Sequence, residues 1–553
     1  MALNTFKFIK LKKNCQEVLY NSISNSLNII NPQSYIPVFS KYNNFNNDFS
    51  KKMIILNNKY ILLKLEPVDN INEHVTNKSN KEQNKYNINE ILKGNMYAYL
   101  IDKDIYTKSK DYNDYKNYIK KQIIFIKSNP LLNVISYMEN QYVFENGIPS
   151  INSFLTNNII NNNNNNAYIE VICCYFLNLL QEKNLSTLFP YYFGSFNGYA
   201  ENYIHDISED YEHIKEMDWF SMKNDILKYE IIKENALNDY QDIEFENVSL
   251  LDYNNEKTIQ NNNKSASSLI SLDLDLQLDD IFSTNINNSD NNSDNNSDNN
   301  SDNNSDNDSL LSIESMDSCM ISETFVKINN FPIQSVIMEN FDMTLTDYDK
   351  KNIPIEEWKT ILFEICFGMA VAQKHLNFIH NDLHSDNIMF KKINKEFKYY
   401  NYNNTYFKVP TYNKETKIID FARGIIKIGP TLYFSDVFKK GGDAYGQYKY
   451  LNKKLFYKHK YLNYSFDLAR LSITLLKYLD FTNKNEIEKY LKELIILKNN
   501  KYINMEEDDF SVYVDLCENS HNAIPKNQLL KPFFKEFIIN KDEIPDNENI
   551  YIL

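Results

Sequence analysis

The residues best suited to chemistry lie in two short blocks in the second half of the chain. The first runs from His380 to Asn387, with Asp382 five residues before Asn387, and the second ends at Asp420. A carboxylate can accept the proton of an attacking hydroxyl, while an amide oxygen and another carboxylate suit Mg²⁺ beside nucleotide phosphates. The H-x-D-L-x-x-x-N spacing therefore predicts phosphoryl transfer, with Asp382 as base and Asn387 and Asp420 as metal ligands.

Two helices and a hairpin are predicted to position these blocks. Apolar residues recur at three- and four-residue steps from 358 to 376, which indicates an amphipathic helix that ends just before His380. Residues 388–390 are typical of a short buried strand, with 417–419 as its hairpin partner and a further extended segment at 405–412 between them. A second apolar helix is expected at 465–479.

The runs FGMAVAQKHLNFIHNDLHSDNIMF and KIIDFARG resemble the eukaryotic-type protein kinases, above all haspin-like kinases and serine/threonine kinases of large DNA viruses. The resemblance implies an α+β, two-lobed protein-kinase-like fold that uses ATP and Mg²⁺ to phosphorylate serine or threonine in a protein substrate. It also implies that Asp467 braces the catalytic loop from below and that His380 braces its backbone. His384 stands at a catalytic position where typical serine/threonine kinases have lysine.

Kinases also need a strand lysine that contacts the α and β phosphates and a helix glutamate that holds it. Lys127 ends the apolar run IIFIK, and Glu170 lies on the otherwise apolar segment AYIEVICCYFLNLL. A buried charge needs a partner, so we expect an ion pair between these two residues. Lys64 in KYILLKLE is a rival for the lysine, and an ordinary solvated strand-end lysine remains the alternative.

The nucleotide-binding elements are less clearly marked. None of the ten glycines falls in a G-x-G-x-x-G pattern, and Gly94 in ILKGNMYAYLI is the only plausible remnant of the phosphate loop. Residues 335–340 (SVIMEN) are typical of an apolar strand that leads into a hinge. Met338 is then expected to be the gatekeeper, and the backbone of Glu339 and Phe341 to face the adenine; a plain strand end is the alternative.

Two local departures from the kinase pattern bear on control and on binding, and the two arginines give a separate indication. Asn381 replaces the arginine that usually precedes the base, so an activation-loop phosphate has no guanidinium to bind there. Ala422 stands where the metal-binding triplet usually has glycine. The chain has only two arginines, Arg423 and Arg470, and both lie beside kinase motifs, which indicates structural sites that need a planar, multidentate donor.

Composition divides the 553 residues into unequal parts. Residues 201–320 contain 28 Asp and Glu against six Lys and include five NNSD repeats, which have no apolar side chains to bury and are expected to be disordered. Because the whole chain has a formal net charge of −15, the rest of it is net positive, which is compatible with an acidic protein substrate.

The sequence divides into five expected parts. They are an amino-terminal extension or cap (1–84), the first part of the amino-terminal lobe (85–200), the acidic, partly disordered insertion (201–322), the last strand and hinge (323–343) and the carboxy-terminal lobe (344–553).

Other classes of site and location find little support in the sequence. The six cysteines show no C-x-x-C spacing, so neither a zinc site nor a disulfide framework is expected. No signal segment or apolar span of membrane length is present, which favours a soluble protein of the cytoplasm, or of the host cytoplasm or virion if the chain is viral. No nucleic-acid partner is predicted, and the oligomeric state is open.

Two other functions remain possible from the sequence. Small-molecule phosphotransferases of the aminoglycoside and choline kinase type share H-x-D-x-x-x-x-N and often have a histidine after the aspartate. A pseudokinase that acts as a binding scaffold is favoured by the missing glycine loop, although Asp382, Asn387 and Asp420 argue against it.

Overall fold

The computed structural model describes ten stretches of the chain and combines helices with sheets, which confirms the expected α+β class. The five NNSD repeats and most of the predicted insertion lie outside the described residues. The described stretches are 8–34, 54–56, 59–68, 94–145, 148–221, 229–234, 323–350, 352–448, 462–503 and 509–553.

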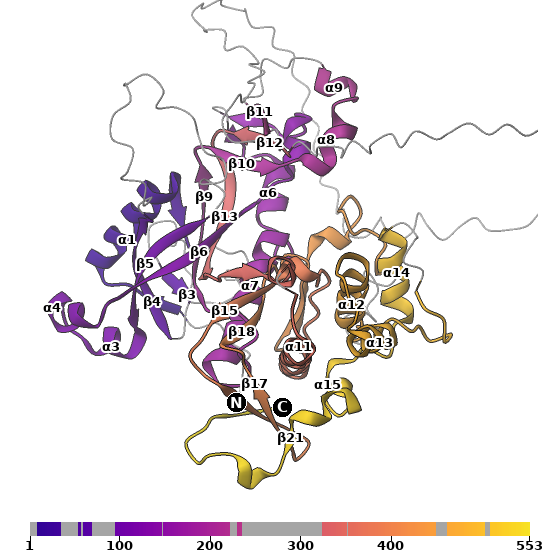
Figure 1. Cartoon of the computed structure of the whole chain (residues 1–553). Coiled ribbons are helices and arrows are strands. Elements are labelled where there is room, and N and C mark those ends of the chain that lie inside the picture. Colours follow the sequence, from indigo (N-terminus) through magenta and orange to yellow (C-terminus); the bar gives the residue numbers. More distant parts are fainter. Residues whose placement is uncertain are drawn as a thin grey trace, which may run out of the picture. The chain divides into compact units, whose positions relative to one another are not determined.

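The amino-terminal half contains a six-stranded antiparallel sheet in the order β2-β9-β13-β6-β5-β4, and Lys127 lies on its strand β6 (Figure 1). Its strands are β2 (Ile29–Gln33), β4 (Tyr60–Pro67), β5 (Asn95–Asp102), β6 (Lys120–Pro130), β9 (Tyr192–Ala200) and β13 (Phe331–Glu339). Strand β13 is buried along its whole length because β9 and β6 flank it on both edges. The expected boundary at residue 84 falls between β4 and β5, which are paired strands of this one sheet.

The chain on either side of the acidic segment forms a second, three-stranded sheet in the order β10-β12-β11. It contains β10 (Tyr203–Asp206), β11 (Tyr229–Glu234) and β12 (Glu323–Ile328), and the short helices α8 (Ser208–Ile214) and α9 (Asp218–Ser221) lie between its first two strands in the sequence. In the register of β11 and β12, Glu234 is directly opposite Glu323. The strand pair therefore holds together the two residues that flank the long intervening segment.

Helix α7 (Asn166–Glu182) is the main helix of the amino-terminal half, and almost all of its residues are buried. It begins where the Asn165 side chain accepts a hydrogen bond from the Ala167 N–H, which satisfies one of the free donors of the first turn. The remaining elements of this half are β1 (Phe8–Lys10), α1 (Lys13–Leu27), β3 (Ile54–Leu56), α3 (Lys103–Lys108), α4 (Tyr112–Tyr115), α5 (Val134–Met138), β7 (Phe144–Glu145), β8 (Ile148–Pro149) and α6 (Phe154–Ile160).

The carboxy-terminal half is built around α11 (Ile355–Leu376), which contains the helix predicted at 358–376, and α12 (Phe466–Tyr478), which is one residue shorter at each end than the helix predicted at 465–479. Helix α11 ends at Asn377, whose left-handed φ of 48° stops the helix and turns the chain into the loop of Asp382. The other helices are α10 (Leu345–Asp349), α13 (Asn485–Leu494), α14 (Asp509–Asn519) and α15 (Pro525–Gln528).

The predicted hairpin is present as β15 (Ile388–Lys392) and β18 (Lys414–Ile418), which pair antiparallel and join β14 (Met343–Thr344). Strands β19 (Ile425–Ile428) and β20 (Thr431–Phe434) form a separate pair. The expected extended segment at 405–412 is β17 (Thr405–Pro410). It belongs to a four-stranded sheet with β16 (Phe397–Tyr402), β21 (Ile538–Ile539) and β22 (Ile550–Ile552), which the sequence did not indicate.

Buried apolar side chains form two large clusters. One contains the side chains of the six-stranded sheet and α1, and the other surrounds α7, α11 and α12. Two separate cores are what a two-lobed fold requires. Among the described helices, none has the length and apolarity needed to cross a bilayer.

Candidate active site

The loop that carries Asp382 is held from below by Asp467 at the start of α12. Its two carboxylate oxygens accept hydrogen bonds from the backbone N–H groups of His380 (3.0 Å) and Asn381 (2.9 Å). Burial raises the pKa of Asp467, although the two N–H donors and His380 favour its charged form. His380 Nε2 lies 2.8 Å from the Ile419 carbonyl oxygen. The loop is thus tied both to α12 and to the residue before Asp420, as the kinase resemblance implies.

Asn387, in the short 3-10 helix Ser385–Asn387, faces back into the same loop. Its Nδ2 donates to the Asp382 carbonyl oxygen at 2.8 Å and lies 2.9 Å from His384 Nε2. The amide oxygen is consequently the atom that Asn387 can offer to a cation. Burial lowers the pKa of His384 although Asp382 and Asp386 oppose this shift, so at neutral pH this histidine is uncharged.

Lys127 lies between the two acidic residues expected to surround it. Its Nζ is 3.1 Å from Glu170 Oε2 on α7 and 2.7 Å from Asp420 Oδ1. Burial alone would lower the pKa of Lys127, but Asp420 and Glu170 outweigh it and raise the pKa. Burial would likewise raise the pKa of Asp420, yet Lys127 holds it below its usual value. The predicted contact between Lys127 and Glu170 is therefore present, and it includes Asp420.

Glu170 is fully buried, and burial raises its pKa despite the nearby Lys127 ammonium. Its second oxygen, Oε1, accepts a hydrogen bond of 3.2 Å from the Phe421 N–H. The Phe421 ring is also fully buried, against His380 at 5.5 Å and Phe378 at 5.9 Å between ring centroids. Glu170 thereby connects α7 to the backbone immediately after Asp420, which fixes the position of that carboxylate.

The rival lysine lies elsewhere. Lys64 is on β4, two strands away from β6, and its side chain is 43% exposed. Its ammonium contacts Glu66 and lies 5.5 Å from the centre of the Tyr99 ring. The structure thus places Lys127, and not Lys64, beside Glu170.

Gly94 lies directly before β5 and against the middle of β6. The Ile126 N–H donates to its carbonyl oxygen at 2.8 Å, and its φ of +55° is left-handed. A Cβ at this position would lie 2.3 Å from the Ile126 oxygen, so only glycine fits without movement of the backbone. The connection between β4 and Gly94, at 69–93, lies outside the described residues, and the role of Gly94 at a phosphate loop stays a prediction.

The expected hinge follows the end of β13. Met338 is buried between Phe125 of β6 and Tyr192 of β9 in the strand register. The Glu339 N–H donates to the Tyr191 carbonyl oxygen at 2.9 Å, and its carboxylate contacts Lys391. The Glu339 N–H is therefore already bonded, and a contact of an adenine with the remaining backbone of Glu339 and Phe341 stays a prediction.

Asn381 and Ala422, the two departures from the kinase pattern, differ in backbone conformation. Asn381 has a left-handed φ of 67°; its Nδ2 donates to the Arg423 carbonyl oxygen at 2.9 Å, and its Oδ1 accepts from the Tyr448 hydroxyl. In the triplet at 420–422 the left-handed residue is Asp420, with a φ of 64°, so Ala422 needs no glycine-like freedom.

The two arginines are both close to the loop of Asp382. Arg423 Nε lies 3.8 Å from Asp382 Oδ2, and the Arg470 guanidinium lies 4.5 Å from the centre of the Tyr513 ring. Planar stacking of this kind suits a guanidinium better than an ammonium group. The stacking of Arg470 uses the planarity of its guanidinium, and Arg423 approaches a single carboxylate oxygen, so the expected multidentate donation stays a prediction.

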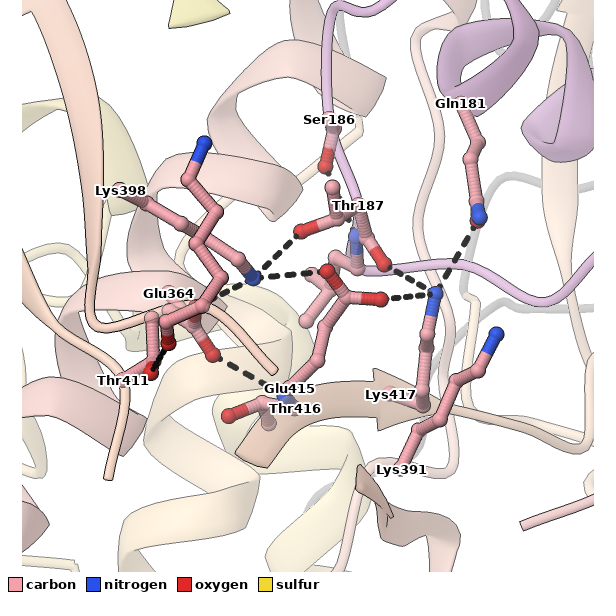
Figure 2. Close-up of polar contacts among 12 residues, drawn as sticks. Gln181, Ser186, Thr187, Glu364, Lys391, Lys398, Thr411, Glu415, Thr416 and Lys417 are labelled. Carbon is pink, nitrogen blue, oxygen red and sulfur yellow. Dashed lines mark hydrogen bonds and ion pairs between the residues drawn. The ribbon is translucent and has the colours of Figure 1, made fainter. Parts of the chain in front are cut away.

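A buried network of charges, which the sequence analysis missed, supports the strand that leads to Asp420 (Figure 2). Lys417 of β18 has no exposed surface, and its Nζ contacts Glu415 Oε2 (2.9 Å), Gln181 Oε1 (3.1 Å) and the Thr187 carbonyl oxygen (2.6 Å). Lys398 of β16 contacts Glu415 and Glu364, each at 2.8 Å. Gln181 is near the end of α7, so the network joins that helix to β18.

The Lys417→Met variant is expected to lose about 3–5 kcal/mol of unfolding free energy, because removal of this fully buried partner leaves the buried Glu415 with one cation and the Thr187 carbonyl without its lysine donor. Denaturant unfolding of the whole chain measures this loss. Lys492→Met, which breaks the exposed pair with Glu488, is the control and is expected to change stability by less than about 1 kcal/mol. Equal stabilities of the two variants would contradict the structural role of Lys417.

Asp436 is a second residue that the sequence analysis missed. Its Oδ1 accepts a hydrogen bond of 3.0 Å from the Asn166 N–H at the start of α7, and its own N–H donates to Asn164. Burial raises the pKa of Asp436 to about 6, although the Asn166 N–H opposes the shift. Helix α7, and with it Glu170, is thus fixed at its first turn by the segment after β20. No sequence motif marks this contact.

No family model matches the chain. Three curated proteins are similar to short segments of it. They are a probable serine/threonine-protein kinase of Dictyostelium discoideum (34% identity over 74 residues, 13% of this chain and 6% of that protein), serine/threonine-protein kinase haspin of Mus musculus (33% over 79 residues, 14% and 10%) and haspin of Bos taurus (32% over 88 residues, 16% and 11%). The chain thus spans only about a tenth of the length of these relatives.

These similarities and the mixed fold agree with the resemblance to haspin-like kinases: the chain is a divergent protein-kinase-like protein. The three relatives come from an amoeba and two mammals, so the similarity to viral kinases stays a prediction.

Proposed function

We propose that the chain transfers the γ-phosphoryl group of ATP to a serine or threonine hydroxyl of a protein. The observation that carries the proposal is the position of Lys127 between Glu170 and Asp420, which brings together residues from β6, α7 and the end of β18. Asp382 and Asn387 lie on a loop that His380 ties to the residue before Asp420. The names of the three relatives support a protein acceptor over a small molecule.

The residues at this site fit Mg²⁺ with phosphates as its other ligands. In the described part of the chain, no three His, Cys, Asp or Glu residues gather as a complete metal site. Mg²⁺ at a nucleotide needs only one or two protein oxygens besides phosphate and water. Asp420 and Asn387 would supply them, because Lys127 contacts only one oxygen of Asp420 and the Asn387 nitrogen is hydrogen-bonded within its loop, which leaves its amide oxygen for a cation. When bound, Mg²⁺ neutralises charge on the phosphate oxygens.

The reaction then assigns one task to each residue. The substrate hydroxyl oxygen bonds to the γ-phosphorus while the bond from that phosphorus to the bridging oxygen breaks, and ADP leaves with the electron pair. Asp382 accepts the hydroxyl proton. Lys127 provides positive charge beside the α and β phosphates, and Glu170 keeps it in place. His384 is uncharged and contacts Asn387, so in this proposal it orients a metal ligand and does not act on the substrate.

The test is phosphate transfer by the purified full-length chain, with radiolabelled ATP, Mg²⁺, a panel of proteins and a panel of aminoglycosides and choline. We expect label on serine or threonine of protein, and none after addition of EDTA. The Asp382→Asn variant, purified in parallel, controls for contaminating kinases. Label on small molecules alone would support the phosphotransferase alternative, and no label anywhere would contradict the proposal.

A further inference from the structure

Helix α14 brings a tyrosine to the proposed base. The Tyr513 hydroxyl donates to Asp382 Oδ1 at 3.2 Å, across 131 positions of sequence. Arg423 Nε approaches the other oxygen, Oδ2, at 3.8 Å. Among the described residues, each carboxylate oxygen of Asp382 therefore has one neighbouring side-chain donor, and neither donor belongs to the loop that carries Asp382. A quarter of the Asp382 side-chain surface stays exposed, which leaves room for a substrate hydroxyl.

Tyr513 is itself held rigidly. Its ring is 9% exposed and packs on Phe466 of α12, with 5.9 Å between ring centroids, while the Arg470 guanidinium covers it. The Asn463 side chain, just before α12, donates to the carbonyl oxygens of Leu516 and Cys517 at 3.1 and 3.2 Å, and so anchors the last turn of α14. A tyrosine has only two side-chain torsions, so this packing fixes the hydroxyl in space.

The direction of the hydrogen bond follows from the charges. Burial, together with the nearby Asp382 carboxylate, raises the pKa of Tyr513, so the phenol remains protonated at neutral pH and donates its proton. An ionised carboxylate can only accept. A hydrogen bond from a neutral hydroxyl to a charged oxygen is stronger than one between neutral groups, and it selects one rotamer of the carboxylate.

Within the described loop at 380–387, the polar side chains Asn381, His384 and Asn387 have their contacts elsewhere than at the Asp382 carboxylate. His384 occupies the position of the usual lysine, but the contacts that the structure shows for it are with Asn387 and Asp386. The hydrogen bond to Asp382 Oδ1 therefore comes from Tyr513 of α14 and not from a side chain of the loop.

We propose that Tyr513 is the positioning residue of Asp382: it holds Oδ1 and so directs the carboxylate toward the acceptor hydroxyl. The inference rests on the proposed function, because it assigns Tyr513 a task in that reaction. Tyr513 does not itself contact the reacting atoms in this proposal. Its contribution is confined to kcat, since ATP binds through other residues.

The decisive variant is Tyr513→Phe, which keeps the ring and its packing but removes the hydroxyl. We expect kcat to fall about 10- to 100-fold, the factor that corresponds to loss of a hydrogen bond to a charged group. The KM for ATP and the melting temperature should stay unchanged. Tyr490→Phe is the matched control, because Tyr490 of α13 is also buried and its hydroxyl lies 3.7 Å from Cys366 Sγ. It is expected to keep full kcat.

Three results for Tyr513→Phe would overturn the inference. An unchanged kcat would show that the hydroxyl does not position the base, and a raised kcat that it blocks the acceptor. A lower kcat accompanied by a fall of several degrees in melting temperature, absent from the Tyr490 control, would reduce Tyr513 to a packing role.

A measurement independent of activity separates this inference from the proposed function. With 3-fluorotyrosine at position 513 alone, the chain gives one ¹⁹F resonance, which we expect to shift in Asp382→Asn and not in Asp480→Asn, a change at an exposed turn. No shift in Asp382→Asn would overturn the Tyr513 contact even in an active enzyme. An inactive wild-type chain with the expected shift would instead overturn the proposed function.

Discussion

Asp382→Asn is expected to bind ATP and Mg²⁺ as the unmodified chain does and to lose turnover by about 10²- to 10⁴-fold, the usual contribution of a general base. The amide has the size of the carboxylate and can still receive the Tyr513 hydrogen bond, but it cannot take the hydroxyl proton. Nucleotide titration and single-turnover phosphate transfer measure the two effects separately.

Asp420→Asn is expected to differ, because this residue is assigned to the metal ion. Its loss should weaken Mg²⁺-dependent nucleotide binding as well as turnover, and should leave Lys127 with Glu170 as its remaining partner. Asp386→Asn is a matched control in the same loop, since Asp386 is 60% exposed and lies 3.7 Å from His384. Near-normal turnover in both Asp382→Asn and Asp420→Asn would refute the assignment.

The second large effect is expected at Lys127. Lys127→Met should reduce phosphoryl transfer by about 10²-fold or more, because an uncharged side chain cannot neutralise phosphate charge in the transition state. Lys64→Met removes an equally long side chain whose partner is Glu66 at the edge of the sheet, and it should remain near full activity. The comparison uses kcat/KM for ATP, with melting temperatures of both variants to exclude unfolding.

A fully active Lys127→Met variant would refute the role of Lys127 at the phosphates. It would also refute the assignment of β6 as the strand that contacts the nucleotide. Equal losses in both variants would instead indicate a general effect of lysine removal on this fold. Only a large loss confined to Lys127 agrees with its contacts to Glu170 and Asp420.

The parts of the site that could be predicted are those whose spacing is local. Asp382 and Asn387 are five residues apart in one loop, and the apolar period of α11 places that loop at a helix end. The pair Lys127 and Glu170 was found from the charge on an apolar helix, since a buried carboxylate requires a cation. The glycine loop could not be tested, because 69–93 lie outside the described residues.

The parts that could not be predicted depend on contacts between distant segments. Nothing in the sequence marks Tyr513 among 41 tyrosines as the neighbour of Asp382. Lys417 and Glu415 are two residues apart on β18 and therefore share a face, yet charged residues on one face usually indicate a solvated side. Their burial is explained by their contacts with Lys398 and Gln181, which come from distant parts of the sequence.

The place of β13 in the sheet has a consequence for synthesis. This strand lies between β6 and β9 but is made after both of them and after the whole acidic segment, with Ser128 and Ser335 paired across 207 positions. A ribosome therefore completes β6 and β9 long before the strand that joins them exists, so both edges stay open to other chains. Such high contact order slows folding. The acidic, hydrophilic segment emerges during that interval, and like charges on neighbouring nascent chains repel one another.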